Sequence, residues 1–430
     1  MISLQTFACL VAYPYFHGVY RIRGWGDAPK ARGSTLLIAN HQHDNDDKVT
    51  VTYVRLHSRL DDTLRIVSGR RLFEPGFMAR KWRWLEWLMR AVNTGALFRA
   101  LGMVPIENEV RSRAFTALGY TVLERHGDLP LTQVFTDEAL ERLPAELRAK
   151  QLSALFEPEG FRVAAHIVLT VRALREPYRG ELIEKMRAEV EQDLAALEQL
   201  LRSGETLWLT PEGRFTKTGA LGRFRAALWR LWPVAESVYV IGISYDAFVG
   251  GRLSMLFRVV PALDRSDPVS SLKAARPITV SQLLADYLCS PALSSAGANS
   301  RPQEGGTTLT QADAFTESDA LNAVRARLVS LPEDAFVDPE LRASPARMTR
   351  AAIDGLVGLG ILARDEERYR LTDKRTSRHF PEVPDIVAHQ AVSFRETIGG
   401  LENIKAGLRS QAVAGPSHGG TPHADKTVLP

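Results

Sequence analysis

The chain has 430 residues, which is enough for two or three domains and at least one large hydrophobic core. Hydrophobic residues make up 45% of the sequence and charged residues 24%, a composition that excludes global disorder. The 54 Lys and Arg residues nearly balance the 50 Asp and Glu residues. This mild net charge permits contact with anionic lipid or nucleic acid but demands neither.

The cysteine content is low and fits a reducing compartment. Cys9 and Cys289 are the two cysteines of the sequence, so we expect neither a disulfide framework nor a thiolate zinc site. The N-terminal residues show no basic leader with a cleavage site, and no apolar run reaches about 18 residues. We therefore expect no secretory signal and no transmembrane helix. A lipid-handling protein with this sequence would lie on the membrane surface.

The first part of the chain predicts one apolar helix followed by buried strands. Residues 2–20 are apolar and aromatic but too short to span a bilayer, so we expect an entry helix or an interfacial segment. Residues 19–23 alternate as a strand does. Residues 34–39 and 64–67 are short apolar runs, which are typical of buried strands.

A basic, tryptophan-rich helix is predicted at residues 77–92. Trp82, Trp84 and Trp87 alternate there with Arg and Lys, a composition typical of a helix at a bilayer interface with anionic headgroups. The same pattern equally suits a helix that packs its tryptophans onto a core while the basic side chains stay solvated. Both interpretations of this helix stay open.

The middle of the chain alternates helices with strands. Residues 127–180 predict a mostly helical insertion, and residues 182–201 predict a helix because apolar residues recur at intervals of three and four. This alternation indicates an α/β domain with a mixed sheet and flanking helices. Further strands are expected at residues 206–210, 238–243 and 255–260.

The C-terminal region predicts helices followed by a hairpin. Helices are expected at residues 316–330 and 345–358, and a hairpin at 361–371, a pattern typical of a winged helix. In that case phosphates would be contacted by Arg342, Arg347 and Arg350. The preferred alternative is a helical cap that stabilises the rest of the chain or docks a partner.

These patterns predict two domains. The expected boundaries are residues 1–289 for the α/β domain, 290–310 for a linker rich in Ser, Gly and Pro, 311–410 for a small helical domain and 411–430 for a disordered tail.

The sharpest local feature is an acidic, histidine-containing segment at residues 40–47 that follows a predicted buried strand. Loops in such positions often carry function. In one chemistry, His41 is a general base oriented by Asp46, and it takes the proton of an attacking hydroxyl, so no Ser or Cys nucleophile is required. In the other chemistry, His41 and His43 bind a metal together with Asp46 or Asp47.

A second polar turn follows the strand predicted at 206–210. It reads Pro-Glu-Gly-Arg-Phe-Thr-Lys over residues 211–217. Glu212 and Arg214 on a glycine-containing turn, with Lys217 nearby, offer a cationic pocket for a phosphate.

Together these segments resemble the signatures of the glycerolipid (lysophospholipid) acyltransferase family. Residues 40–46 are similar to that family's Asn-His-x-x-x-x-Asp signature, and residues 211–214 are similar to its Pro-Glu-Gly block. Residues 68–73 resemble the basic segment that follows the first block, and residues 102–106 resemble the second block. These landmarks occur in the order that the family has.

The resemblance implies an acyltransferase that moves a fatty acyl group from an acyl thioester to a hydroxyl of a glycerolipid or lysophospholipid-type acceptor. The donor would be acyl coenzyme A or acyl carrier protein, with no other cofactor and no metal. His41 and Asp46 would be the catalytic pair, and Glu212, Gly213 and Arg214 would help to bind the acceptor. The protein would be cytoplasmic and peripheral on the inner face of the cell membrane, without nucleic acid as a partner.

The second block departs from the family pattern at its end. Asn108 stands where the family usually has an Arg that holds the acceptor phosphate, and Arg111 or Arg113 is the alternative. The sequence therefore does not specify the acceptor.

The alternative function is a metal-dependent hydrolase that uses His41, His43 and Asp46. The segment TLLIANHQHDND superficially resembles the His-x-His-x-Asp-His motif of the metallo-β-lactamase family. Asn45 and Asp46 occupy the positions of the last Asp and His of that motif.

Overall fold

A computed structural model describes residues 3–26, 33–58, 63–73, 94–106, 112–213, 215–290 and 314–414. By spatial proximity the chain divides into two compact units. The first consists of Met1–Leu64 and Gly204–Pro430, and the second of Arg65–Ser203. The expected fold class is confirmed, because the protein is α/β with a mixed seven-stranded sheet and flanking helices.

Five strands of the sheet belong to the first unit, in the order β1-β9-β8-β2-β7. All neighbouring pairs are parallel except β8 and β9, which are antiparallel. Each strand lies where apolar or alternating residues predict one. The bounds are Tyr20–Gly26 for β1, Thr35–Ala39 for β2, Thr206–Leu209 for β7, Ser237–Asp246 for β8 and Leu253–Pro261 for β9.

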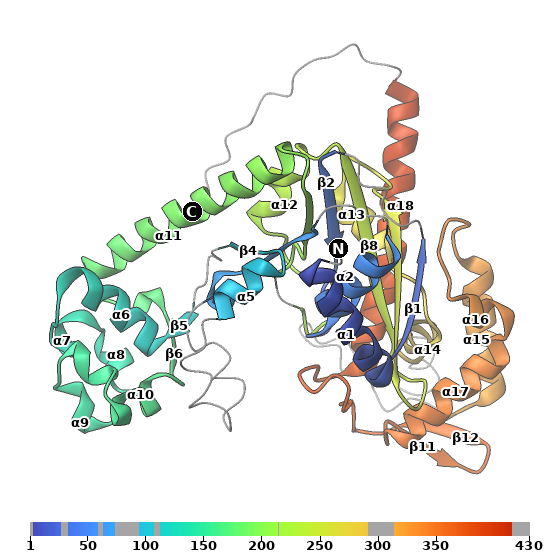
Figure 1. The fold of residues 1–430 in the computed structure, drawn as a ribbon. Helices are drawn as coiled ribbons and strands as arrows, with labels where there is room; N and C mark the ends of the chain where they lie inside the picture. Colours follow the sequence, from blue (N-terminus) through green and yellow to red (C-terminus); the bar gives the residue numbers. More distant parts are fainter. Residues whose placement is uncertain are drawn as a thin grey trace. The chain divides into compact units, whose positions relative to one another are not determined.

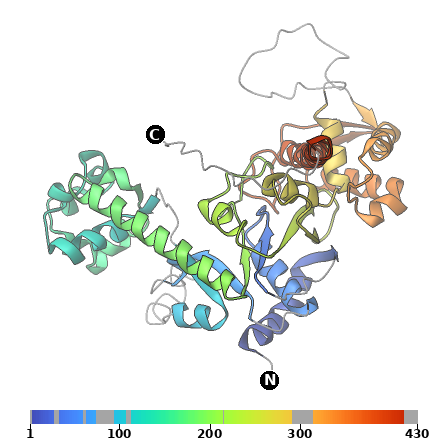
Figure 2. The same cartoon turned by 90° about the horizontal axis from the view of Figure 1, so that it is seen from above.

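Helices cover both faces of these strands (Figures 1 and 2). Every residue of β2 is buried, as expected for a parallel strand between two helical layers. On one side, α1 (Leu4–Val19) packs against α2 (Asp46–His57). On the other side, α18 packs against α13 and α14. The bounds are Pro268–Ala275 for α13, Val280–Leu288 for α14, Ile386–Ala414 for α18, and Ala226–Leu231 for the short α12.

The C-terminal part contains the helices and the hairpin that the sequence predicts. It has α15 (Glu317–Ser330), α17 (Pro345–Gly358) and the antiparallel pair β11 (Leu362–Asp365) and β12 (Arg368–Leu371). The structure adds β10 (Phe315–Thr316), which pairs with β12, and the short helix α16 (Pro339–Ala343). The long α18 was not expected, and the winged-helix assignment is not confirmed.

Ion pairs join this C-terminal part to β1, the edge strand of the sheet. Arg23 donates through both terminal nitrogens to the carboxylate of Asp338, at 2.7 and 2.8 Å. The Asp338 side chain is fully buried and that of Arg23 is 13% exposed. Arg21 forms a second, more exposed pair with Glu340 at 2.5 Å. These ion pairs attach the segment around α16 to the edge strand of the sheet.

The second unit contains the parallel pair β3 and β4, the long helix α11 and a group of short helices. The short elements between residues 112 and 173 surround a hydrophobic core of their own, which includes Phe115, Leu118 and Phe135. Strand bounds are Arg65–Gly69 for β3, Met103–Ile106 for β4, Ser112–Ala114 for β5 and Val168–Thr170 for β6. Helix bounds are Arg70–Phe73 for η1, Thr94–Ala100 for α5, Phe115–His126 for α6, Leu131–Val134 for α7, Asp137–Leu140 for α8, Ala145–Arg148 for α9, Leu152–Leu155 for η3, Pro158–Ala164 for α10, Val171–Ala173 for η4 and Tyr178–Arg202 for α11.

Several sequence-based expectations lie outside the described residues. These are the helix at 77–92 with its three tryptophans, Asn108, Arg111 and most of the linker at 290–310. The proposed domain boundaries stay a prediction. Within the described segments, none of the helices combines the length and apolarity that crossing a bilayer would require.

The pair between β1 and the C-terminal part predicts a large stability effect. We expect Asp338→Ala to lower the free energy of unfolding by about 3 kcal/mol, because it removes both hydrogen bonds to Asp338 and leaves the partly buried guanidinium of Arg23 with only its longer contact to Glu340, at 3.4 Å. Chemical denaturation of the full chain measures this. The matched control is Arg350→Met, since the pair between Arg350 and Glu317 is exposed and its loss should barely move the unfolding midpoint. Equal effects of the two substitutions would contradict the prediction.

Candidate active site

The two polar segments that the sequence singles out meet at one edge of the sheet. β2 and β7 are parallel neighbours, with Ile38 beside Leu209 in the register. Their carboxyl ends therefore lie at the same edge, and each continues directly into one of the segments. The backbone N–H of His41 donates to Glu212 Oε1 at 2.9 Å. Residues separated by 171 positions in the sequence are thus joined by a hydrogen bond.

Asn40, the first residue of the acidic segment, anchors the end of β2 to β8. Its amide group donates to the Ile243 carbonyl at 3.0 Å and accepts from the Ile243 N–H at 2.6 Å. The Asn40 side chain is completely buried. Because both ends of the amide are engaged by backbone, this residue fixes the position of the loop that follows.

The Asp46 carboxylate is the centre of that loop. Asp46 is the first residue of α2 and is fully buried. Its Oδ2 accepts from the backbone N–H of Gln42 and, at 2.7 Å, from the backbone N–H of His43. Its Oδ1 accepts from the hydroxyl of Tyr245 on β8. The loop before α2 therefore holds Oδ2, and β8 holds Oδ1.

His41 lies next to this carboxylate, with Nδ1 at 3.4 Å from Asp46 Oδ2. This distance is long for a hydrogen bond, as is common for catalytic contacts before substrate binds. The His41 side chain is 16% exposed, whereas that of Asp46 is inaccessible. The opposite ring nitrogen, Nε2, is then the one that can accept a proton from a substrate. The imidazole and the ring of Phe215 form a T-shaped pair, with 5.9 Å between the ring centroids.

Opposing influences act on the pKa of His41. Burial lowers it, but the hydrogen bond and the charge of Asp46 raise it, with smaller contributions from Asp47 and Glu212. The net result is a pKa above the ordinary value. A raised pKa makes the imidazole a stronger base and stabilises the imidazolium that forms when it accepts a proton.

Tyr245 is a residue of this site that the sequence did not reveal. Burial, followed by the charge of Asp46 and their hydrogen bond, raises its pKa well above the ordinary value, so the phenol stays protonated and keeps donating to Asp46. It lies in β8 just after the apolar run at residues 238–243, where the sequence carries no motif. Only the pairing of β8 with β2 brings it to the acidic segment.

Glu212 ties the two segments together. One carboxylate oxygen accepts from His41 N, and the other accepts from Gly222 N at 2.6 Å. Burial raises the pKa of Glu212, while these two backbone donors lower it, and the net shift is upward. With both oxygens engaged by backbone, the carboxylate holds the turn in place. Its expected contact with an acceptor stays a prediction.

Gly213 occupies a backbone conformation that requires glycine. Its φ is +66°, and a Cβ there would lie 2.3 Å from Nε of Arg225. The guanidinium of Arg225 donates from that same Nε to the Glu212 carbonyl at 3.2 Å. Arg214, expected to bind the acceptor, lies outside the described residues. Lys217, expected nearby, pairs with Glu382 at 3.4 Å.

His43 has aromatic neighbours. Its ring contacts those of Tyr20, Tyr245 and Phe380 at centroid distances of 5.9, 5.7 and 5.6 Å. Within the described ranges, no three His, Cys, Asp or Glu side chains are grouped so that they could hold a metal ion. The metal-dependent alternative stays a prediction that metal analysis can decide.

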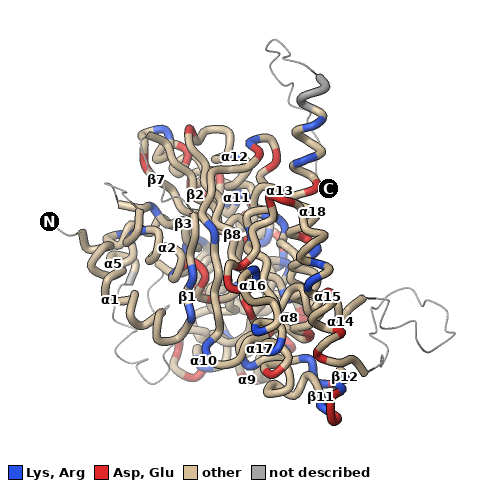
Figure 3. Tube along the Cα trace, turned by 90° about the vertical axis from the view of Figure 1, so that its right-hand side faces the viewer, with Lys and Arg blue, Asp and Glu red and all other residues tan. Residues whose placement is uncertain are grey.

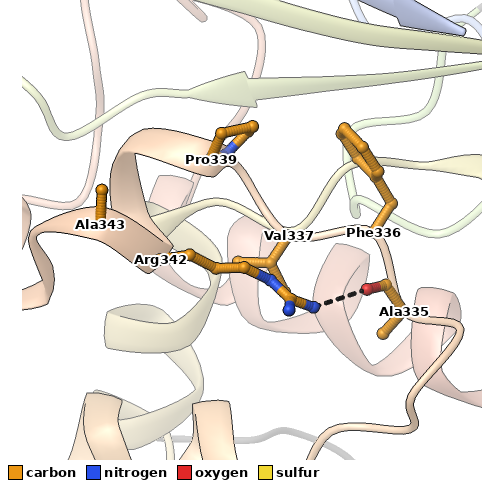
Figure 4. Close-up of a pocket in the computed structure, with 6 residues that line it drawn as sticks. All are labelled: Ala335, Phe336, Val337, Pro339, Arg342 and Ala343. Atoms are coloured by element: carbon orange, nitrogen blue, oxygen red, sulfur yellow. Dashed lines mark hydrogen bonds between the residues drawn. The ribbon is translucent and has the colours of Figure 1, made fainter.

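A separate pocket of about 510 Å³ lies in the C-terminal part (Figure 4). The guanidinium of Arg342, one of the arginines considered for phosphate contact, donates there to the Ala335 carbonyl at 3.2 Å. None of the residues predicted for the site lines this pocket. Its lining consists of Ala335, Phe336, Val337, Pro339, Arg342 and Ala343.

No protein-family model matches the chain, and no curated protein matches it either. The chemistry that the site can perform is therefore inferred from the geometry of its residues. A partly exposed imidazole is oriented by a buried carboxylate, at the carboxyl ends of parallel strands where α/β proteins commonly bind ligands. Such a pair can remove a proton from a substrate hydroxyl and return it to a leaving group.

The geometry predicts how His41 titrates. We expect its pKa to lie above about 6.5, the ordinary value for histidine. Asp46→Asn should lower that pKa, because it removes the charge that favours the imidazolium. NMR titration of the histidine ring signals measures this, with His41→Gln identifying the His41 signal. Tyr245→Phe serves as a comparison that keeps the Asp46 charge. An unchanged titration in Asp46→Asn would show that the two side chains do not interact.

Proposed function

We propose that the protein is an acyltransferase that moves a fatty acyl group from an acyl thioester to a hydroxyl of a glycerolipid or lysophospholipid-type acceptor. The observation that carries this proposal is the partly exposed His41, oriented by the buried Asp46 and joined through its backbone to Glu212. The two segments that resemble the family signatures thereby form one hydrogen-bonded site. The donor would be acyl coenzyme A or acyl carrier protein.

In the proposed reaction, His41 Nε2 accepts the proton of the acceptor hydroxyl. The hydroxyl oxygen attacks the thioester carbonyl carbon, a C–O bond forms, and a tetrahedral oxyanion results. Collapse of this intermediate breaks the C–S bond and expels the thiolate, which takes the proton back from His41. Asp46 keeps Nδ1 protonated and stabilises the transient imidazolium. No covalent acyl-enzyme forms, so the site needs no Ser or Cys nucleophile.

Acceptor recognition is assigned to the second segment. Arg214 follows Gly213 directly in the sequence, and a guanidinium suits an acceptor phosphate. Glu212 and Gly213 would contribute by fixing the shape of this turn beside His41.

Removal of the base tests the reaction. We expect His41→Ala to lower kcat about 10²–10⁴-fold, the usual contribution of a general base. Transfer is measured from acyl coenzyme A and from acyl carrier protein to a panel of lysolipids and to glycerol 3-phosphate. His57→Ala is the matched control, because His57 is an exposed histidine at the end of α2. Absence of transfer by the wild-type protein to every acceptor, together with a stoichiometric bound metal, would reject the acyltransferase and favour the hydrolase.

Membrane association is the second part of the proposal, with the inner face of the cell membrane as the expected site. α1 contains no Lys, Arg, Asp or Glu, and its trace carries no charge colour in Figure 3. Phe7, Val11 and Tyr15 are 59%, 61% and 64% exposed, and their spacing of four places them on one face of the helix. An exposed apolar face that includes aromatic rings suits the boundary between headgroups and acyl chains.

Charges on this face should weaken binding to lipid. We expect the double substitution Phe7→Glu and Val11→Glu to reduce co-sedimentation with vesicles of zwitterionic and anionic phospholipids by about tenfold or more, because charged side chains are costly in that boundary. Val329→Glu is the matched control, since Val329 is an exposed apolar residue on α15. Membrane attachment through α1 would be wrong if both proteins sedimented with vesicles as the wild type does.

A further inference from the structure

The long C-terminal helix α18 presents buried polar side chains to the other elements of the first unit. Ser393 and Thr397 lie one turn apart and are each 1% exposed, and Glu396 lies between them in the sequence. Buried polar groups are costly unless they are hydrogen-bonded, so their partners indicate what this face does.

Ser393 is the meeting point of a buried network. Its hydroxyl oxygen lies 3.3 Å from Nε2 of Gln42, 3.0 Å from Nε2 of Gln282 and 3.5 Å from a terminal nitrogen of Arg276. The second terminal nitrogen of Arg276 donates to the Ser393 carbonyl at 2.9 Å. Gln42, Gln282 and Arg276 are themselves buried. The Ser393 hydroxyl therefore lies within hydrogen-bonding distance of three buried donors, of which its oxygen accepts two at a time.

Gln42 connects this network to the proposed catalytic pair. It stands between His41 and His43, and its backbone N–H donates to Asp46 Oδ2. Its side chain reaches in the other direction to Ser393. The peptide that orients Asp46 is thus fixed by α18, at a distance of 351 positions in the sequence.

Glu396 makes a comparable contact with the loop that follows the second segment. Its Oε2 accepts from the backbone N–H of Leu221 at 3.2 Å, and its Oε1 pairs with Lys273 at 2.9 Å. The next residue, Gly222, donates to Glu212 at 2.6 Å. Successive backbone N–H groups of one loop are therefore held by Glu396 from α18 and by Glu212 from the site.

We infer that Ser393 and Glu396 are positioning residues, through which α18 holds the loops that carry Asp46 and Glu212 in their working geometry. This inference rests on the proposed function for its effect on catalysis. It gives the C-terminal part a role in the reaction although neither residue touches the reacting atoms. Charged or titratable groups near Ser393 are Arg276, Glu396 and the buried His389, whose pKa burial and Arg276 lower to about 4.

Removal of the Ser393 hydroxyl provides the test in the full-length protein. We expect Ser393→Ala to lower kcat on the order of tenfold with little change in KM, since small displacements of catalytic groups slow the chemical step. The His41 pKa should also fall, because Asp46 is held less firmly beside it. Gln42→Met should have the same two effects, and the double variant should be no worse than Gln42→Met alone.

The matched control is Thr397→Val. Thr397 is as buried as Ser393 and lies on the same helix, but its hydroxyl donates at 2.9 Å to the Ser393 carbonyl, within α18. We expect Thr397→Val to leave both kcat and the His41 titration near the wild-type values. For the second contact, Glu396→Ala should lower kcat, and Glu396→Gln, which keeps an acceptor for Leu221, should restore most of it.

Two readouts separate the inference from the proposed function. Acyl transfer absent from the wild type would overturn the function, while the His41 titration would still report whether Ser393 positions the site. A His41 titration and a kcat in Ser393→Ala that match those of Thr397→Val would overturn the positioning role. If Ser393→Ala fails to fold, Gln42→Met breaks the same contact from the other side and decides the question.

Discussion

The buried carboxylate of Asp46 is the interaction on which the rest of the site depends. Removing a carboxylate from water is costly unless donors replace the lost hydration. The chain supplies these donors from two backbone N–H groups of its own loop, from His41 and from the phenol of Tyr245. This requirement closes the loop around the carboxylate and fixes β8 relative to α2. The same contacts orient the imidazole of His41. They therefore both stabilise the loop and support the proposed chemistry.

A second buried carboxylate, that of Glu212, is likewise stabilised by hydrogen-bond donors. It is satisfied by the backbone N–H of His41 in the first polar segment and by that of Gly222, in the loop that follows the second segment. Since β2 and β7 are parallel neighbours, the segments begin at the same edge of the sheet, and Glu212 fixes their separation. Both acids therefore organise backbone, and His41 is the partly exposed group that they leave for a substrate.

The C-terminal part belongs to the same compact unit as β2 and β7. It is attached to the edge strand through Arg23 and Asp338, and α18 contacts the loops of the site through Ser393 and Glu396. The role expected for this part from the sequence, a helical cap or a nucleic-acid module, stays a prediction. The sequence analysis missed α18, in which the buried apolar residues Val387, Ala391, Phe394 and Leu401 alternate with the buried polar residues His389, Ser393 and Thr397.

The sequence by itself determined the local elements and the chemical identity of the central pair. Apolar runs and periodic spacing encode β2, β7, β8 and α11 within short stretches, and the spacing of His41 and Asp46 is likewise local. Only the tertiary structure decided which residues surround that pair. The bond from Tyr245 to Asp46 spans 199 positions and that from Gln42 to Ser393 spans 351. Contacts of this kind leave no periodicity in the sequence, because they arise only when the sheet and its helical layers bring distant segments together.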